Sequence, residues 1–242
     1  MTKSAAKRLL PKVPDLPGAS RRAQYSASTK RALVDAALEQ FSEKGYGATS
    51  LDAIVAEAAV TKGALYHHFT GKQALFEAVF ERVEADAAQE IAAAAKGVRD
   101  PWEKSLTGLR GFLAVVQEPT YRRVVIQEGP AVLGYERFRE HGERSSFAIV
   151  LEIVHDVLAG GPWQLDGPMV ETFSRIFFGA LSSAGESVAS AEDPEEASER
   201  VEAAIGYILL GLRSLMDSGV VPEDPVLAPG SVAQQLLMPP ED

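Results

Sequence analysis

Apolar residues recur at helical spacing along most of the chain. The first run begins at Ser28 and stops before a glycine at position 45. Its apolar positions follow the i, i+3, i+4, i+7 spacing and are Val34, Ala37, Leu38 and Phe41. The pattern predicts a helix of about four turns that ends at this glycine.

Two short helices are expected next. Thr49 is followed by Asp52 three residues later, a capping-box pattern with Asp in place of the usual Glu, which predicts a helix N-terminus at Thr49. The segment AAVTKG is then a tight connection, with Thr61 as the N-cap of a third helix that runs to Phe69. A Thr-Gly pair breaks that helix, and a long fourth helix begins at Lys72.

The remainder of the chain stays helical beyond Gly97 and carries no strand signal. Pro- and Gly-containing segments interrupt the apolar pattern. Candidate helices lie near 101–117, 119–128, 134–159, 168–189 and 195–217. The expected fold class is therefore all-α, with a Pro-rich tail over 221–242 and a disordered basic extension over 1–27.

Charge is distributed unevenly, although the net charge is −10. Residues 1–72 hold 11 Lys and Arg against 6 Asp and Glu, whereas residues 73–242 hold 13 against 28. Such asymmetry is typical of a nucleic-acid-binding segment on an acidic body. A solvated N-terminal tail explains the same charge equally well, because Lys and Arg of residues 1–22 lie among prolines.

Composition excludes several classes of protein and site. The chain has no cysteine, so it has no disulfide framework, thiolate metal site or cysteine nucleophile. No apolar run approaches the roughly 20 residues of a membrane span, and no secretory signal is present, so a cytoplasmic protein without membrane contact is expected. No nucleophile elbow, P-loop or dinucleotide motif occurs, so neither an enzyme nor a cofactor is expected.

The second and third predicted helices form a helix-turn-helix unit, whose second helix enters the DNA major groove. In the segment TKGALYHHF, Leu65 and Phe69 point to one side of the helix. The opposite side can approach a charged, grooved surface with a cation, a residue without a side chain and two polar rings. These outward residues are Lys62, Gly63, Tyr66 and His67.

Other residues of this region are further candidates for DNA contact. Lys72, Thr49 and Ser50 lie at helix N-termini, where free N–H groups favour phosphate. The adjacent His67 and His68 diverge by about 100°, whereas a helical metal chelate needs histidines at i and i+4. No metal is therefore expected, and His68 is expected to face the packed flank of the unit.

The stretch GYGATSLDAIVAEAAVTKGALYHHFTGKQALFEAV resembles the DNA-binding signature of the TetR family of bacterial transcriptional repressors, and the resemblance runs from about Lys30 to Val83. It departs from the family at Gly71, where many members carry a bulkier polar residue. The resemblance implies that a set of residues here touches operator DNA, with Thr49 and His68 as secondary candidates. The set is Thr61, Lys62, Gly63, Ala64, Tyr66, His67 and Lys72.

The resemblance also implies an organisation of domains. A three-helix helix-turn-helix DNA-binding domain would occupy 28–74, and a helical effector-binding and dimerisation domain would occupy 75–220. Small and apolar residues in the last two long helices are candidates for a homodimer contact, and the alternative is that these faces pack within one chain. They are Gly179, Ala180, Ser183, Ala184, Ile205, Leu209 and Leu212.

A small-molecule effector would lie between helices of the second domain. His155 shares a predicted stripe with Leu158 and is the polar candidate, while a core histidine with a protein partner is the alternative. The candidate ligand residues are Phe112, Tyr121, Tyr135, Phe147, Leu151, His155 and Phe177.

Together these patterns predict a homodimeric repressor of a palindromic operator that a small-molecule effector releases. The alternative is a small-molecule-binding helical protein in which the DNA-binding module is vestigial. The outward set on the third helix favours the first reading.

Overall fold

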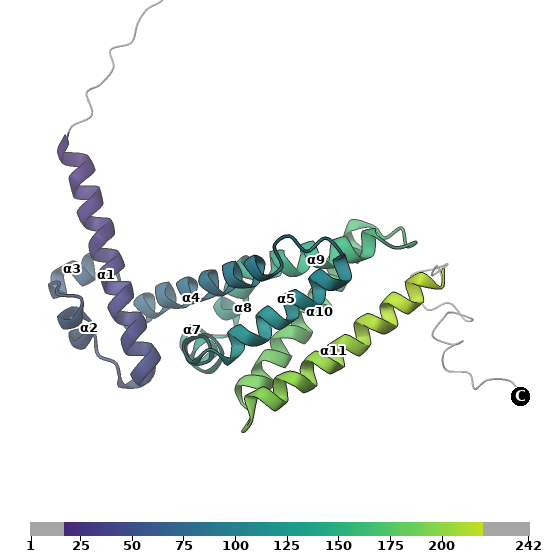
Figure 1. Cartoon of the computed structure of the whole chain (residues 1–242). Helices are drawn as coiled ribbons and strands as arrows, with labels where there is room; N and C mark the ends of the chain where they lie inside the picture. The colour runs from purple at the N-terminus through teal and green to yellow at the C-terminus, as the bar shows by residue number, and fades with distance from the viewer. Residues whose placement is uncertain (1–16, 220–242) are drawn as a thin grey trace, which may run out of the picture.

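The computed structural model describes residues 17–219, and every regular element in that range is a helix, as predicted (Figure 1). The C-terminal tail and residues 1–16 of the predicted extension lie outside the described residues. The elements are α1 (Pro17–Ala48), α2 (Leu51–Glu57), α3 (Lys62–His68), α4 (Lys72–Ala94), α5 (Pro101–Gln117), α6 (Pro119–Tyr121), the π-helix η1 (Arg122–Glu128), α7 (Gly129–Leu133), α8 (Tyr135–Ser145), α9 (Phe147–Ala159), α10 (Gly167–Ala189) and α11 (Pro194–Asp217).

Helix α1 differs from its prediction at both ends. It begins at Pro17 rather than at Ser28, so the second part of the predicted disordered extension is helical. At its other end, where the sequence predicts that the helix stops, α1 has a kink instead. Gly45 adopts φ +79°, and the helix continues for three more residues. A positive φ of this kind is accessible to glycine at little cost, which explains the residue found there.

Helices α1 to α3 form one packed unit, and α4 leads from it into the rest of the molecule (Figure 1). The core of this unit includes the fully buried Phe41, Ile54, Leu65 and Phe76. The same cluster also takes in Val124 of η1. The predicted boundary between residues 74 and 75 falls inside α4, so the two predicted domains share one continuous helix and a common core.

The second half of the chain is a bundle in which the far end of α4 packs on α5, and α9, α10 and α11 pack on the other sides of α5. The predicted helices over 101–117, 168–189 and 195–217 match α5, α10 and α11 closely. Two predictions need correction. The helix expected over 119–128 is α6 followed by a π-helix, and the one expected over 134–159 breaks at Ser146 into α8 and α9.

None of the helices within residues 17–219 is long and apolar enough to cross a membrane. Three of the long helices begin with an aspartate whose side chain accepts a backbone N–H of the first turn: Asp100 for α5, Asp166 for α10 and Asp193 for α11. A proline at the start of each adds a fixed φ. These local signals explain why the starts of these helices are readable from sequence.

The residue that follows the C-cap of α2 is poorly suited to its backbone conformation. Ala59 has φ +52°, in the left-handed region that an L side chain enters at a cost of about 1–2 kcal/mol. Its N–H bonds to the carbonyl of Ala56, and the N–H of Val60 bonds to that of Val55, which closes the helix. Glycine is the usual residue at this position after a helix C-cap.

We expect Ala59→Gly to raise the free energy of unfolding by about 0.5–1 kcal/mol, because glycine relieves this strain. The measurement is urea unfolding followed by circular dichroism. Ala56→Gly, an exposed site inside the same helix, is the matched control and should lose about 1 kcal/mol. An equal loss in both variants would show that position 59 is unstrained.

Candidate nucleic-acid interface and effector pocket

Helix α3 presents the side chains that the sequence predicts. Its N-cap Thr61 accepts the N–H of Ala64 at Oγ1, at 3.1 Å, as expected. Leu65 is fully buried and Phe69 is 6% exposed, so this side of α3 anchors it to α1 and α2. The opposite side is exposed and carries Lys62, Gly63, Tyr66 and His67, with Ala64 half-buried beside them.

The two adjacent histidines separate as expected. His67 is exposed, whereas His68 is half-buried with its ring centroid 6.5 Å from that of Phe69. Their own rings meet edge-to-face at 5.2 Å. Among residues 17–219 no three acidic or histidine side chains are grouped to hold a metal ion. His67 is thus available to a partner, and His68 contributes to packing.

Asp52 has a role that the sequence did not indicate. Its carboxylate lies 2.6 Å from Lys62 Nζ, and both side chains are well exposed. This carboxylate, by accepting a hydrogen bond from the ammonium, raises the pKa of Lys62. The Lys62 ammonium of α3 therefore has a carboxylate partner in the free protein, and a phosphate that approached it would have to compete with Asp52.

The start of α2 requires a correction. The N-cap is Ser50, whose hydroxyl accepts the N–H of Ala53, and not Thr49. Thr49 is 3% exposed, and its hydroxyl lies 2.8 Å from the carbonyl of Gly45 and 3.1 Å from that of Gln40. The Thr49 side chain therefore ties the turn to α1 and is not available to DNA, whereas Ser50 stays exposed.

Lys72 makes contacts within the chain that the sequence did not indicate. Its ammonium donates to the carbonyls of Tyr46 at 2.7 Å and Thr49 at 2.8 Å, and it lies 4.2 Å from the centroid of the Tyr46 ring. An ammonium has three donors, so one remains for a phosphate. Lys72 therefore fastens the N-terminus of α4 to the turn that precedes α2.

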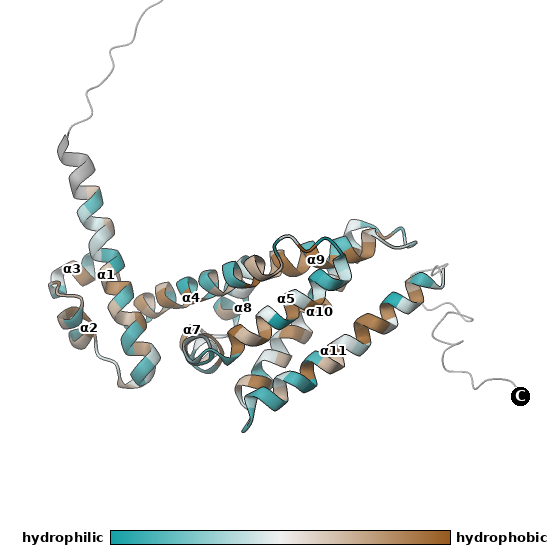
Figure 2. Cartoon of the chain, viewed as in Figure 1, coloured by the Kyte–Doolittle hydropathy of each residue, from teal (hydrophilic) through white to brown (hydrophobic). Residues whose placement is uncertain are grey.

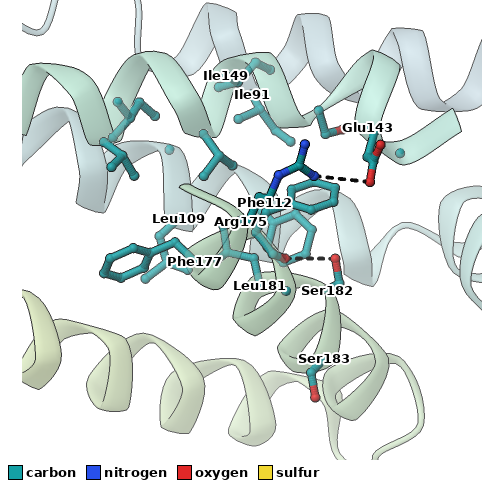
Figure 3. A pocket seen from close by; sticks show the side chains of 18 of the residues that line it. Ile91, Leu109, Phe112, Glu143, Ile149, Arg175, Phe177, Leu181, Ser182 and Ser183 are labelled. Carbon is teal, nitrogen blue, oxygen red and sulfur yellow. Dashed lines mark hydrogen bonds and ion pairs between the residues drawn. The ribbon is translucent and has the colours of Figure 1, made fainter. Parts of the chain in front are cut away.

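A cavity of about 550 Å³ lies in the second half of the molecule, between α4, α5 and α8 to α11. Most of its lining is apolar or aromatic, and Figure 3 shows Phe112, Phe177 and Leu181 there. Four of the predicted ligand residues line it: Phe112, Tyr121, Tyr135 and Phe177.

The other three predicted ligand residues, Phe147, Leu151 and His155, do not line this cavity. The His155 side chain is 66% exposed beside Asp156, so the prediction that it points inward is wrong. Leu151 and His155 face a separate hollow next to the α9–α10 connection. The row of α9 that lines the main cavity includes Ile149, Ile153 and Val157. Because α9 is apolar on more than one side, the sequence pattern did not reveal which side faces inward.

The predicted dimer residues divide into two groups. Gly179, Ala180 and Ser183 of α10 are exposed, and Ala184 is half-buried. Ile205, Leu209 and Leu212 of α11 are half-buried and line the cavity, as Gly179 and Ser183 also do, and a dimer contact through these residues stays a prediction. The exposed apolar side chains are Ile176 of α10 (63%) and Tyr207 (75%), Ile208 (58%) and Leu210 (62%) of α11. Figure 2 shows apolar positions along α11.

Both halves of the chain match known families. Residues 33–79 match the family described as "Bacterial regulatory proteins, tetR family". Residues 102–212 match "Tetracyclin repressor-like, C-terminal domain". The chain belongs to the TetR family. It is a DNA-binding transcriptional regulator of this family, with the helix-turn-helix formed by α2 and α3.

Individual relatives of the TetR family agree with this assignment. The HTH-type transcriptional regulator SrpR of Pseudomonas putida is 26% identical over 68% of this chain and 76% of its own length. The HTH-type transcriptional regulator AcrR of Shigella flexneri is 37% identical, over 42% of this chain and 46% of its own length. A crystal structure of a TetR-family regulator from Pectobacterium atrosepticum has a TM-score of 0.67 and 29% identity, and covers 78% of this chain and 96% of that one.

The structural contacts of Lys72 are testable by removal of its ammonium group. We expect Lys72→Met to lower the free energy of unfolding by about 1–3 kcal/mol, because two partly buried carbonyls lose their donor. Urea unfolding gives the measurement. Lys96→Met, at an exposed lysine of the α4–α5 connection, is the control and should change stability by less than about 0.5 kcal/mol. If Lys72→Met kept the parental free energy of unfolding but bound DNA more weakly, the contacts with the two carbonyls would not stabilise the fold, and Lys72 would act only through phosphate.

Proposed function

We propose that this TetR-family regulator is a repressor that binds a palindromic operator as a homodimer and leaves it when a small molecule enters the cavity. The exposed face of α3, with Lys62, Tyr66 and His67, is the observation that carries the proposal. Lys62 can donate to guanine or phosphate, and the two rings can donate to phosphate while packing on sugars or thymine methyls.

A homodimer is supported by the exposed apolar surface of α10 and α11. Ile176, Tyr207, Ile208 and Leu210 are more than half exposed, while small residues at Gly179 and Ala180 leave room for close approach of a second pair of helices. A two-fold axis through this surface makes a self-complementary contact. It would present two α3 helices to half-sites about 34–36 Å apart.

Release is supported by the contacts between the cavity and the DNA-binding unit. Tyr121, Val125 and Ile126 line the cavity, and the last two belong to η1. At the end of η1, both carboxylate oxygens of Glu128 accept the N–H of Tyr46, at 2.8 and 2.9 Å. A ligand that moves η1 would therefore act directly on the kink of α1 and change the position of α3.

The DNA contact is tested with Lys62→Ala/Tyr66→Ala in the full chain. We expect its affinity for a duplex from the chain's own upstream region to fall about 30-fold or more, since each lost base or phosphate contact is worth about 1 kcal/mol or more. Fluorescence anisotropy at several salt concentrations gives the affinity. Lys96→Ala, at the exposed lysine of the α4–α5 connection, is the control and should bind as the parent does. Parental affinity in the double variant would exclude α3 as the recognition helix.

The dimer surface is tested with Tyr207→Glu/Ile208→Glu. We expect the sedimentation mass of the protein to fall from twice that of the chain to that of one chain, because two carboxylates would be buried without partners. Ala92→Glu/Ala93→Glu adds the same charge to the exposed side of α4 and should leave the dimer intact. A dimer that survives the first pair of substitutions must use another surface.

A further inference from the structure

One buried carboxylate lies in the cavity wall. Glu84 of α4 is 4% exposed and is the only acidic side chain among residues 17–219 that is buried to this degree. The cavity lining to which it belongs is mostly apolar and aromatic, and includes Phe80 of α4 and Phe112 of α5. Removing a carboxylate from water is unfavourable unless its charge is balanced by a nearby cation.

The protein satisfies the hydrogen bonds of Glu84 and leaves its charge unbalanced. Tyr121 donates its hydroxyl to Oε1 at 3.0 Å, and Ser145 donates to Oε2. Within the described part of the chain, Glu84 forms no ion pair with Lys, Arg or His. Burial, together with the Glu84 charge, raises the pKa of Tyr121 well above its ordinary value of 10.0, so the phenol keeps its proton and remains a donor.

The two arginines of the cavity are already paired with carboxylates. Arg175 lies 2.8 Å from Glu171 and 3.5 Å from Glu143, and Arg139 lies 2.9 Å from Glu143. Figure 3 shows Arg175 directed toward Glu143. Both arginines are about half exposed, so this group is neutral and hydrated. The cavity therefore offers little attraction to an anion. The charges of its lining that remain are both negative, on the buried Glu84 and on the exposed Glu186.

The walls of the cavity suit a cation with an apolar body. Phe80, Phe112, Phe138 and Tyr121 line the cavity, and aromatic faces attract positive charge. A volume of about 550 Å³ corresponds to a drug-sized molecule. We propose that the effector is a lipophilic organic cation, such as an aromatic ammonium, whose charge lies beside Glu84 while its body fills the apolar space. This inference rests on the proposed binding of an effector in the cavity.

Two ions of the same shape and opposite charge test the ligand class. Tetraphenylphosphonium and tetraphenylborate are titrated separately into the full chain without DNA, by isothermal calorimetry at matched ionic strength. We expect the cation to bind at least tenfold more tightly than the anion, since Glu84 attracts one and repels the other. Equal affinities, or a preference for the anion, would overturn the proposal. This comparison uses the unmodified chain, so its outcome does not depend on whether a variant folds.

Substitution then assigns the preference to the carboxylate. Glu84→Gln should weaken binding of the phosphonium at least tenfold without weakening that of the borate. Glu90→Gln removes the same charge from an exposed site on α4 and should leave both affinities unchanged. If Glu84→Gln folds and keeps the parental ratio of affinities, the carboxylate is not the determinant and the proposal fails.

The same ions separate this inference from the proposed repressor function. Each is added to the complex of the chain with its upstream duplex, and anisotropy reports dissociation. If the cation binds in a Glu84-dependent manner, the proposed ligand class is supported, whether or not the DNA dissociates. If the DNA stays bound when the cation binds, the proposal that an effector releases the operator is wrong. Absence of a charge preference overturns the ligand class while DNA binding through α3 stands independently.

Discussion

The hydrogen bonds between the Glu128 carboxylate and the Tyr46 N–H are the constraint on which the arrangement of the molecule depends. They require glycine at position 45. A Cβ there would lie 2.5 Å from Glu128 Oε1, and the kinked backbone has φ +79°, which favours glycine. At the carbonyl of the same residue, Lys72 donates a hydrogen bond to Tyr46. One turn of backbone is thereby held by α4 and by η1, and α2 and α3 follow directly from it.

This constraint explains why the DNA-binding unit is not separate from the rest. Val124 of η1 is fully buried in the same core as Phe41 and Leu65, so displacement of η1 disturbs packing beneath α3 as well as the Glu128 bonds. Closely packed interiors respond to displacement by shifting whole elements, because their side chains leave little free volume. A π-helix is an uncommon element that often occurs at functional sites, and here it links the cavity to the α1 kink.

The sequence predicted those features that depend on neighbours in the chain. The inward and outward sides of α3 follow from a single helical period, so Leu65 and Lys62 were placed correctly, and Pro101 marked the start of α5. Features set by contacts across the chain were missed. His155 lies on a helix with two apolar stripes, and only tertiary packing decides which stripe is inside. The Asp52–Lys62 and Glu128–Tyr46 contacts join residues with no periodic relation.

Tyr121 connects the cavity to the elements that hold the DNA-binding unit. It lines the cavity, donates to Glu84 of α4 and is the last residue of α6 before η1 begins. A positive charge beside Glu84 would compete with the Tyr121 hydroxyl for the same carboxylate, and so would act on α4 and on the start of η1 together. Both elements reach the α1 kink, α4 through Lys72 and η1 through Glu128. A ligand at one carboxylate would therefore reach both contacts that hold the recognition unit in place.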